Sequence, residues 1–357
     1  MKRERRSYIV LGLSLSVMLG FGTRANAQSL TWLGTLPGGY GSGARGVSAD
    51  GTVVIGWVDN ASGQQRAFRW TLSGGMQDLG VLGGYESEAS GVSADGTVVV
   101  GVAYDASGRS RAFRWTPSDG MQGLATLPGG YESGARGVSA DGTVVFGWAE
   151  GIYERPACIW TASGEIQAIR LLEENDVGEA YGVSADGSVV VGWTYNSNAI
   201  EQGFRWTQSG GMQLWISDLS GVLGVTWDGS VAVGWDVAGP FRWMASGELE
   251  YLNSVYASLL TDDSYLAAAY AISPDGRYIV GVGYNAATER GEAYLLDTWR
   301  TGDTNGDGCV DDADLLAVLL AFGTQGTGYT RHDDINKDGI VDDADLLTVL
   351  FNFGSGC

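Results

Sequence analysis

Histidine is almost absent from this chain of 357 residues, which contains only His332. Imidazole is the most frequent general base near neutral pH and a common metal ligand. The long segment before His332 therefore has no histidine to act as a base, to activate a nucleophile or to bind a metal. Catalysis in that segment would have to rely on acidic and aromatic side chains.

Basic residues are also scarce, with 21 Lys and Arg against 42 Asp and Glu and a formal charge of −21. Removing residues 1–27 would take away five basic residues and one acidic residue, which leaves 16 and 41 and a charge of −25. A surface of this sign repels phosphates. The composition therefore argues against nucleic acid as a partner.

Long apolar runs are missing beyond the N-terminus. The run from Tyr8 to Phe21 follows a basic start and precedes Ala25-Asn26-Ala27. A basic segment, a short apolar segment and an A-x-A site are typical of a secretory signal peptide. We expect residues 1–27 to be removed after Ala27, leaving a secreted or extracytoplasmic protein that does not span a membrane.

The last sixty residues carry one acidic twelve-residue pattern twice. Oxygen-bearing side chains occupy loop positions 1, 3, 5, 9 and 12, Gly occupies position 6, and position 7 offers a backbone carbonyl, as calcium loops require. The predicted ligands of two calcium ions are Asp303, Asn305, Asp307, Cys309 (carbonyl), Asp311 and Asp314, then Asp334, Asn336, Asp338, Ile340 (carbonyl), Asp342 and Asp345. The alternative is a pair of solvated acidic turns, but recurrence of the full pattern after 31 residues favours calcium.

An apolar, helix-forming segment follows each loop, at 315–323 and 346–354, and no such segment precedes the first loop. This unit is a duplicated loop-helix, half of an EF-hand, with Asp instead of Glu at position 12. Residues 302–357 resemble a type I dockerin, and we assign the domain to 300–357. The resemblance implies docking to a cohesin-like protein or a cell-surface scaffold.

The match to dockerins is incomplete at the positions that face a cohesin. Loop positions 10 and 11 are Asp312-Ala313 and Asp343-Ala344 instead of hydroxyl residues, and the helices contain no Lys or Arg. Calcium-stabilised anchoring or spacing without a cohesin is therefore the competing interpretation.

Three cysteines are present, and export would permit a disulfide. In a two-fold module of this kind, the end of the second helix returns beside the first loop. The dockerin-like arrangement thus implies a bond between Cys309 and Cys357. Cys158 replaces a recurring Phe and is expected to be a buried thiol without a nucleophilic role.

Residues 29–299 repeat with a period near 45. Each unit has an Asp-Gly turn between β-branched runs, which predicts a hairpin. The turn aspartates are Asp50, Asp95, Asp141, Asp186, Asp228 and Asp275. Six equivalent carboxylates are better explained by hairpin backbones that they satisfy than by catalysis.

A third strand in each unit carries two large residues that share one face, as in Ala67-Phe-Arg-Trp70, and a short turn leads to a fourth strand such as Met76–Leu79. Four strands every 45 residues predict an all-β fold, a six-bladed β-propeller of four-stranded blades over 28–299. The third strand is similar to that of exported HAF-repeat proteins, and more distantly to WD-type blades.

The two ends of the repeat region are complementary. The sixth unit ends at Trp299 without a fourth strand, while Leu30–Leu33 forms a spare strand at the start. Pairing them near Ala293–Leu296 would close the ring and remove open edges. An open β-solenoid is the alternative. The fifth unit, roughly 215–251, is shortened between its second and third strands.

Three Gly-rich loops carry tyrosines that we expect on one end of the ring: Tyr40, Tyr85 and Tyr131. Tyrosines in such loops can stack on a glycan or contact a peptide, although ordinary loop packing is the alternative. The sequence favours a non-catalytic binding or scaffold protein displayed through a calcium-dependent module. An extracellular polysaccharide hydrolase or lyase recruited to a cohesin-bearing complex is the second interpretation.

Overall fold

The computed structural model describes residues 28–153, 155–169, 178–183, 189–195, 201–207, 210–215, 222–226, 231–244, 248–260, 262–306, 308–325, 332–335 and 340–357. The predicted signal peptide at 1–27, the turn aspartates Asp186 and Asp228, and the loop residues Asp307, Asn336 and Asp338 lie outside these ranges.

The described residues form six antiparallel sheets of four strands each. The first three are β2 (Ser42–Val47), β3 (Val53–Asp59), β4 (Gln65–Thr71), β5 (Gly75–Asp78); β6 (Gly83–Val92), β7 (Val99–Asp105), β8 (Ser110–Thr116), β9 (Gly120–Gly123); and β10 (Ser133–Val138), β11 (Val145–Ala149), β12 (Ala157–Trp160), β13 (Ile166–Ile169).

The other three sheets are β14 (Gly178–Val183), β15 (Val189–Tyr195), β16 (Glu201–Thr207), β17 (Gly211–Trp215); β18 (Val222–Val225), β19 (Val231–Asp236), β20 (Gly239–Met244), β21 (Leu249–Tyr251); and β22 (Tyr265–Ile272), β23 (Tyr278–Asn285), β24 (Arg290–Asp297), β1 (Ser29–Trp32). Three of the helical segments are α1 (Leu252–Val255), α2 (Asp312–Ala321) and α3 (Asp343–Asn352), and η1 (Ala257–Leu259) is a 3-10 turn.

The Asp-Gly turns are stabilised by their own side chains. In the first sheet, Asp50 accepts the Ser48 hydroxyl at 2.6 Å and the Thr52 amide at 3.0 Å, while the Val53 amide donates to the Ser48 hydroxyl. Asp95, Asp141 and Asp275 hold their turns in the same way. For these four turns the predicted structural role of the aspartates is confirmed.

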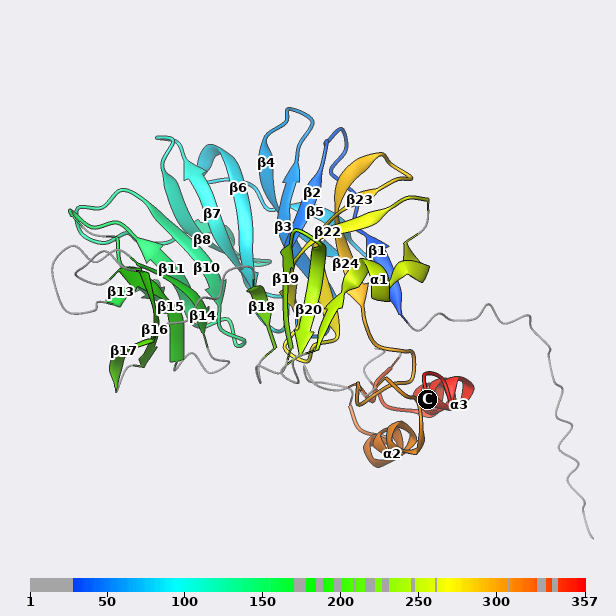
Figure 1. Ribbon diagram of the computed structural model, residues 1–357. Coiled ribbons are helices and arrows are strands. Elements are labelled where there is room, and N and C mark those ends of the chain that lie inside the picture. Colours follow the sequence, from blue (N-terminus) through cyan, green and yellow to red (C-terminus); the bar gives the residue numbers. More distant parts are fainter. Residues whose placement is uncertain are drawn as a thin grey trace, which may run out of the picture.

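Successive sheets lie side by side (Figure 1). A Cβ on Gly51, whose φ is 70°, would lie 2.6 Å from the Tyr278 ring, so this turn of the first sheet is covered by the last sheet. The Ala49 amide donates to the Ala94 carbonyl, and the Ala94 amide to the Ala140 carbonyl, so successive turns are adjacent.

The hydrophobic core is divided into clusters between adjacent sheets. Phe68 and Trp70 of β4 pack with Tyr278 and Val280 of β23, and Phe113 of β8 packs with Ile55 of β3. Further clusters join the second sheet to the third, the third to the fourth, and the fifth to the sixth. These clusters join five of the six neighbouring pairs of sheets, and no cluster of the described residues joins the fourth sheet to the fifth. Four-stranded antiparallel sheets packed in series in this way form a β-propeller arrangement.

The predicted pairing of the chain ends is confirmed. β1 is antiparallel to β24, with Leu30 opposite Leu296 and Trp32 opposite Tyr294. The Leu33 amide extends the ladder by donating to the Ala293 carbonyl at 3.0 Å. The N-terminal strand therefore completes the sheet that the C-terminal repeat leaves with three strands.

In the fifth unit, the sequence predicted the shortened loop but not the helical segments that follow. Its second and third strands, β19 and β20, are joined by two residues, which confirms the shortened loop. The helical segments α1 and η1 after β21 were not predicted. Leu252 and Tyr256 there are buried, and the Asn253 side chain bonds both the amide and the carbonyl of Leu266, fixing the start of β22.

A small unit containing α2 and α3 follows the sheets and lies below them in Figure 1. The Gly354 amide donates to the Val310 carbonyl, and the Val310 amide donates to the Ser355 carbonyl. Val341 makes the corresponding pair with Gly323 and Thr324. This exchange makes the unit two-fold, with Val310, Val318, Val341 and Val349 in its core.

The junction between the sheets and this unit is built on Arg277. Its guanidinium donates twice to Asp297, at 2.9 Å each, and lies 5.5 Å from the centre of the Trp299 ring. His332 packs on Trp299 and lies 3.2 Å from the Asp275 carboxylate. In the ranges that the structure describes, no helix is long and apolar enough to cross a membrane.

Candidate functional sites in the C-terminal loops and the central channel

The first acidic loop wraps around the carboxylate at its start. Asp303 is buried, and its two oxygens accept the amides of Gly306 at 2.7 Å and Gly308 at 3.0 Å. Gly308, at loop position 6, has a φ of 87°, a conformation that favours glycine. The loop therefore makes the sharp turn that a calcium loop needs at this position.

The aspartate at position 12 closes each loop and begins the helix that follows. Asp314 is fully buried, and it accepts the Thr304 amide at 2.7 Å and the Asp311 amide at 2.9 Å. Asp345 repeats these bonds with Ile335 and Asp342. Asp311 and Asp342 also cap α2 and α3 by accepting the amides of Ala313 and Ala344.

The donor set of these loops fits a hard cation. Carboxylates lie at both ends of each loop, and Cys309 and Ile340 would supply the position 7 carbonyls. In the part of the chain that the structure describes, no three acidic, His or Cys side chains are already gathered as a metal cluster. Asp307, Asn336 and Asp338, which would complete the two sites, lie outside that part.

Cys309 and Cys357 form a disulfide that ties the first loop to the chain after α3. Cys158 is outside this bond, fully buried in β12, and its sulfur lies 3.6 Å from the Pro156 carbonyl oxygen. The disulfide fixes the same loop-to-terminus contact that the Val310 backbone bonds make.

The three loop tyrosines are exposed beside the starts of β2, β6 and β10. Because the turns that end these strands are adjacent, their starts lie together at the opposite end of the propeller. Tyr85 stacks on Tyr104 with the ring centres 5.5 Å apart, and the Arg109 guanidinium lies 4.2 Å from the centre of the Tyr131 ring. The structure thus gives Tyr85 and Tyr131 packing partners and leaves much of each ring accessible.

The central channel contains a pocket of about 330 Å³ that the sequence did not reveal. Its wall is made mainly by the inner strands β2, β6, β10, β18 and β22. Each inner strand, β14 included, has a bulge at one register, and a bulge turns its extra residue out of the ladder. The bulge residues are Arg45, Ser90, Arg136, Tyr181, Leu223 and Tyr270.

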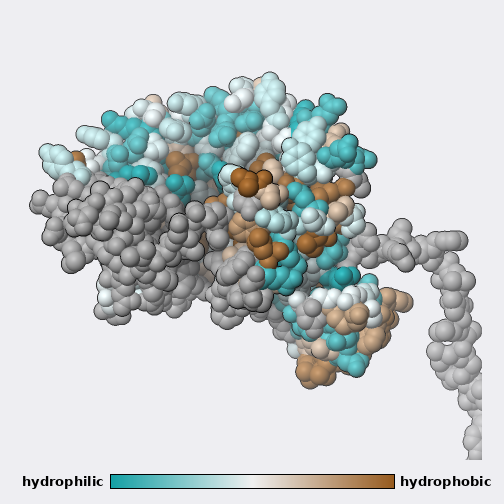
Figure 2. Space-filling model, in the orientation of Figure 1, coloured by the Kyte–Doolittle hydropathy of each residue, from teal (hydrophilic) through white to brown (hydrophobic). Residues whose placement is uncertain are grey.

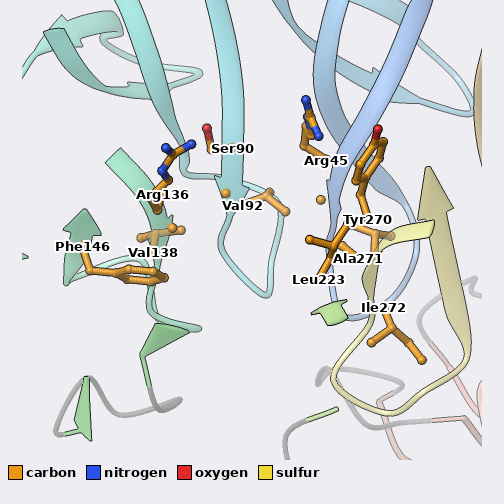
Figure 3. A pocket seen from close by; sticks show the side chains of 14 residues that line it. Arg45, Ser90, Val92, Arg136, Val138, Phe146, Leu223, Tyr270, Ala271 and Ile272 are labelled. Carbon is orange, nitrogen blue, oxygen red and sulfur yellow. The ribbon is translucent and has the colours of Figure 1, made fainter. Parts of the chain in front are cut away.

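Five of these bulge residues line the pocket; the side chain of Tyr181 is not described. Figure 3 shows Arg45 and Arg136 on opposite sides of the pocket, with Ser90 between them. The Arg45 Nε donates to Glu88 at 2.8 Å, and its guanidinium lies 4.3 Å from the centre of the Tyr270 ring. Arg45 thereby contacts the second and the sixth sheets from the first.

A signal for this site was present in the sequence. The motif Ala-X-Gly-Val-Ser recurs as 44–48, 89–93, 135–139 and 180–184, and X is the only position that varies among the four copies. Variation at one position within a repeat that is otherwise identical indicates a position that packing does not dictate. The periodic pattern alone could not show that a bulge points this residue into the channel.

Two arginines of the third strands, Arg69 and Arg242, have structural partners, whereas the buried Nε of Arg114 has no hydrogen-bond partner among the described residues. Arg69 Nε donates to the Gly96 carbonyl of the next sheet at 3.2 Å, and Arg242 pairs with Glu250 of its own sheet. Burial lowers the pKa of Arg69. Arg69 thus links the first sheet to the second.

Comparisons with protein-family models and with curated protein sequences gave no match. Among solved structures, TolB from Acinetobacter baumannii is 11% identical with a TM-score of 0.40, and the match covers 71% of this chain and 53% of TolB. The β-propeller domain of the Trilobed protease from Pyrococcus furiosus is 9% identical with a TM-score of 0.42 (76% and 96% covered).

Oligogalacturonate lyase from Vibrio parahaemolyticus is 10% identical with a TM-score of 0.42, and the match covers 75% of this chain and 93% of the lyase. At such identities and TM-scores these matches concern only the arrangement of strands. They assign no activity to this chain.

Proposed function

We propose that this chain is a secreted, non-catalytic binding or scaffold protein. Its repeat region is a closed, six-bladed propeller of the HAF-repeat kind that serves as the binding platform. Its C-terminal unit is a dockerin-like module that binds two calcium ions and anchors or displays the propeller. The observation that carries the proposal is the duplicated acidic loop, wound around Asp303 and closed by the buried Asp314.

Calcium would be held by the oxygens of both loops. In the first loop these are the side chains at 303, 305, 307, 311 and 314 with the Cys309 carbonyl, and in the second those at 334, 336, 338, 342 and 345 with the Ile340 carbonyl. When bound, the ion supplies charge compensation for carboxylates that otherwise repel one another. The module's own residues contribute the wrapped backbone and the two helix caps.

An apolar surface on the module supports a docking role. Corresponding residues of α2 and α3 are exposed in both copies, and Leu320 and Phe351 are exposed by 78% and 83%. Figure 2 shows brown, hydrophobic surface over this unit. The other exposed apolar residues are Leu316, Leu319, Phe322, Leu347, Leu350 and Phe353. Exposed apolar patches of this kind mark interaction sites, so a cohesin-like protein or surface scaffold is the proposed partner.

The alternative is a polysaccharide hydrolase or lyase carried by the same module. Glycoside hydrolysis uses two carboxyl groups that flank the bond to be broken. The fourteen residues of the channel pocket supply guanidinium, hydroxyl and apolar groups instead. This composition favours binding over hydrolysis at that site.

A glycan array and a turnover screen test the proposal together. The calcium-loaded full chain is applied to the array, and the same polysaccharides are incubated with it and assayed for new reducing ends and for unsaturated products. Retention of a glycan without products supports a binding protein. Catalytic release of products that survives further purification would establish the enzyme instead.

A further inference from the structure

The channel pocket gathers charged, hydroxyl-bearing and apolar side chains that the calcium loops do not involve. One tier consists of Arg45, Ser90, Arg136 and Tyr270 at the bulges. A second tier, lower in Figure 3, is apolar. Its members are Val92, Val138, Phe146, Leu223 and Ile272.

Arg45 is held with its donors ready for a ligand. Its Nε is fixed by Glu88, and its guanidinium lies over the Tyr270 ring. Within the described residues, its two terminal Nη groups have no protein hydrogen-bond partner. A guanidinium oriented in this way loses little side-chain entropy when it binds a planar, bidentate anion.

The charges of the pocket favour an anion although the protein as a whole is acidic. Two of the fourteen lining residues are arginines and none is acidic, against a formal charge of −21 for the chain. Glu88 pairs with Arg45 but is not part of the lining. The volume of about 330 Å³ is at the small end of ligand pockets, which suits a ligand that contains a single ring.

We propose that this pocket binds a small organic carboxylate, whose oxygens accept hydrogen bonds from the Nη groups of Arg45. The body of the ligand would lie against the apolar tier, with Ser90 and Tyr270 offering hydroxyls to any polar substituent. The proposal rests on the proposed function, since it names the ligand class of the propeller. The carboxylate can come from a free acid or from the acidic sugar at the end of a glycan.

The simpler explanation is that Arg45 has only a structural role, in which its ion pair with Glu88 links the first sheet to the second. A matched control separates the two accounts. Arg111 and Asp105 form a comparable pair at 3.2 Å, with similar partial exposure, outside the pocket. Arg111→Gln therefore removes a partly exposed ion pair, in this case within the second sheet, without touching the channel.

The test is calorimetric titration of the calcium-loaded chain in a buffer free of carboxylates and chelators. The probes are benzoate and glucuronate, each with a neutral counterpart on the same ring, benzyl alcohol and glucose. We expect each carboxylate to bind at least about tenfold more tightly than its counterpart, because a charge-assisted pair is lost in the neutral compound. Arg45→Gln should weaken carboxylate binding at least about tenfold, and Arg111→Gln should leave it unchanged.

Three results would overturn the assignment: no binding of either acid at about 10 mM, equal affinity for acid and neutral counterpart, or full affinity in a folded Arg45→Gln chain. A third probe, a disaccharide ending in glucuronate, identifies the source. If the disaccharide binds more tightly than glucuronate, the natural ligand is the end of a glycan. If the disaccharide binds no more tightly than glucuronate and benzoate, the natural ligand is a free acid. Failure here leaves the calcium loops and the glycan array to decide the proposed function separately.

Discussion

At the scale of single residues, the buried serines Ser42, Ser87 and Ser133 each accept a backbone amide of the neighbouring sheet. The Ser87 hydroxyl accepts the Ala67 amide at 2.9 Å and donates to the Gly80 carbonyl at 2.6 Å, both in or beside the preceding sheet. Ser42 makes the same two bonds to Ala293 and Gly34, across the closing contact. These bonds satisfy backbone groups that would otherwise be buried without partners.

We predict that Ser87→Ala destabilises the propeller. The substitution leaves a buried amide and a carbonyl unsatisfied, at a cost of about 1–3 kcal/mol. Urea unfolding measures the difference in free energy of unfolding. Ser107→Ala, at an exposed loop position, is the control and should stay within about 0.5 kcal/mol of the parent chain. Equal stability of the two variants would show that the hydroxyl of Ser87 is dispensable.

The turn aspartates predict a loss of stability in acid. The Ser139 hydroxyl and the Thr143 amide bond Asp141 and lower its pKa from 3.8. A carboxyl whose folded pKa is depressed stabilises the fold above its unfolded pKa, and that contribution disappears as the pH falls through the folded pKa. The free energy of unfolding should therefore fall below about pH 4.

The contribution of this one group is isolated by comparing Asp141→Asn with the parent chain at each pH. The stability difference between them should be largest near neutral pH and shrink below about pH 4. Other acidic groups, including those of the two C-terminal acidic loops, affect both chains equally and cancel. A difference that does not change with pH would contradict the assigned role of the Asp141 carboxylate.

At the scale of elements, the strands could be predicted because turn residues such as Asp-Gly and Gly-rich segments separate them in the sequence. The Asp-Gly turn fixes the first hairpin of the four units whose turns are described, and the predicted pairing of Leu30–Leu33 with Ala293–Leu296 is observed. α1 and η1 were missed because a four-residue helix is too short to show a helical period. The bulges were missed because a one-residue shift leaves the apolar alternation of the flanking strand segments intact.

We predict that deleting residues 28–33 destabilises the whole propeller rather than only its end. The deletion removes the edge strand on β24, the edge contact of Trp32 with Tyr294, and the buried Leu33 side chain. Thermal unfolding should show a clearly lower midpoint than that of a chain beginning at Gln28. Hydrogen exchange should find slow amides at 30–33 in the latter chain. Fast exchange there, together with an unchanged midpoint, would indicate an open array of repeats.

At the scale of the whole molecule, the site residues divide into those that a local pattern identifies and those that only the ring brings together. The predicted calcium ligands of each loop lie within twelve residues of one another, so spacing alone suggested them. Arg45, Glu88 and Tyr270 come from three different sheets and meet only when the sheets pack around the channel. No local pattern could place them in one pocket.

The two parts of the chain are joined through few residues. Arg277, Asp297 and Trp299 form a compact anchor at the end of β24, and His332 reaches Asp275 from the module. The loop tyrosines lie at the end of the propeller away from the Asp-Gly turns, while this junction lies beside the turn at Asp275. A partner on the module would therefore leave the tyrosine end accessible.

The central claim is that the duplicated loops bind calcium, and calorimetric titration of the metal-free full chain with calcium tests it most directly. The account predicts two sites per chain, one site in Asp303→Ala, and two sites in the control Asp50→Ala, which removes an equally acidic residue from a propeller turn. Absence of binding in the parent chain, or two intact sites in Asp303→Ala, would contradict it.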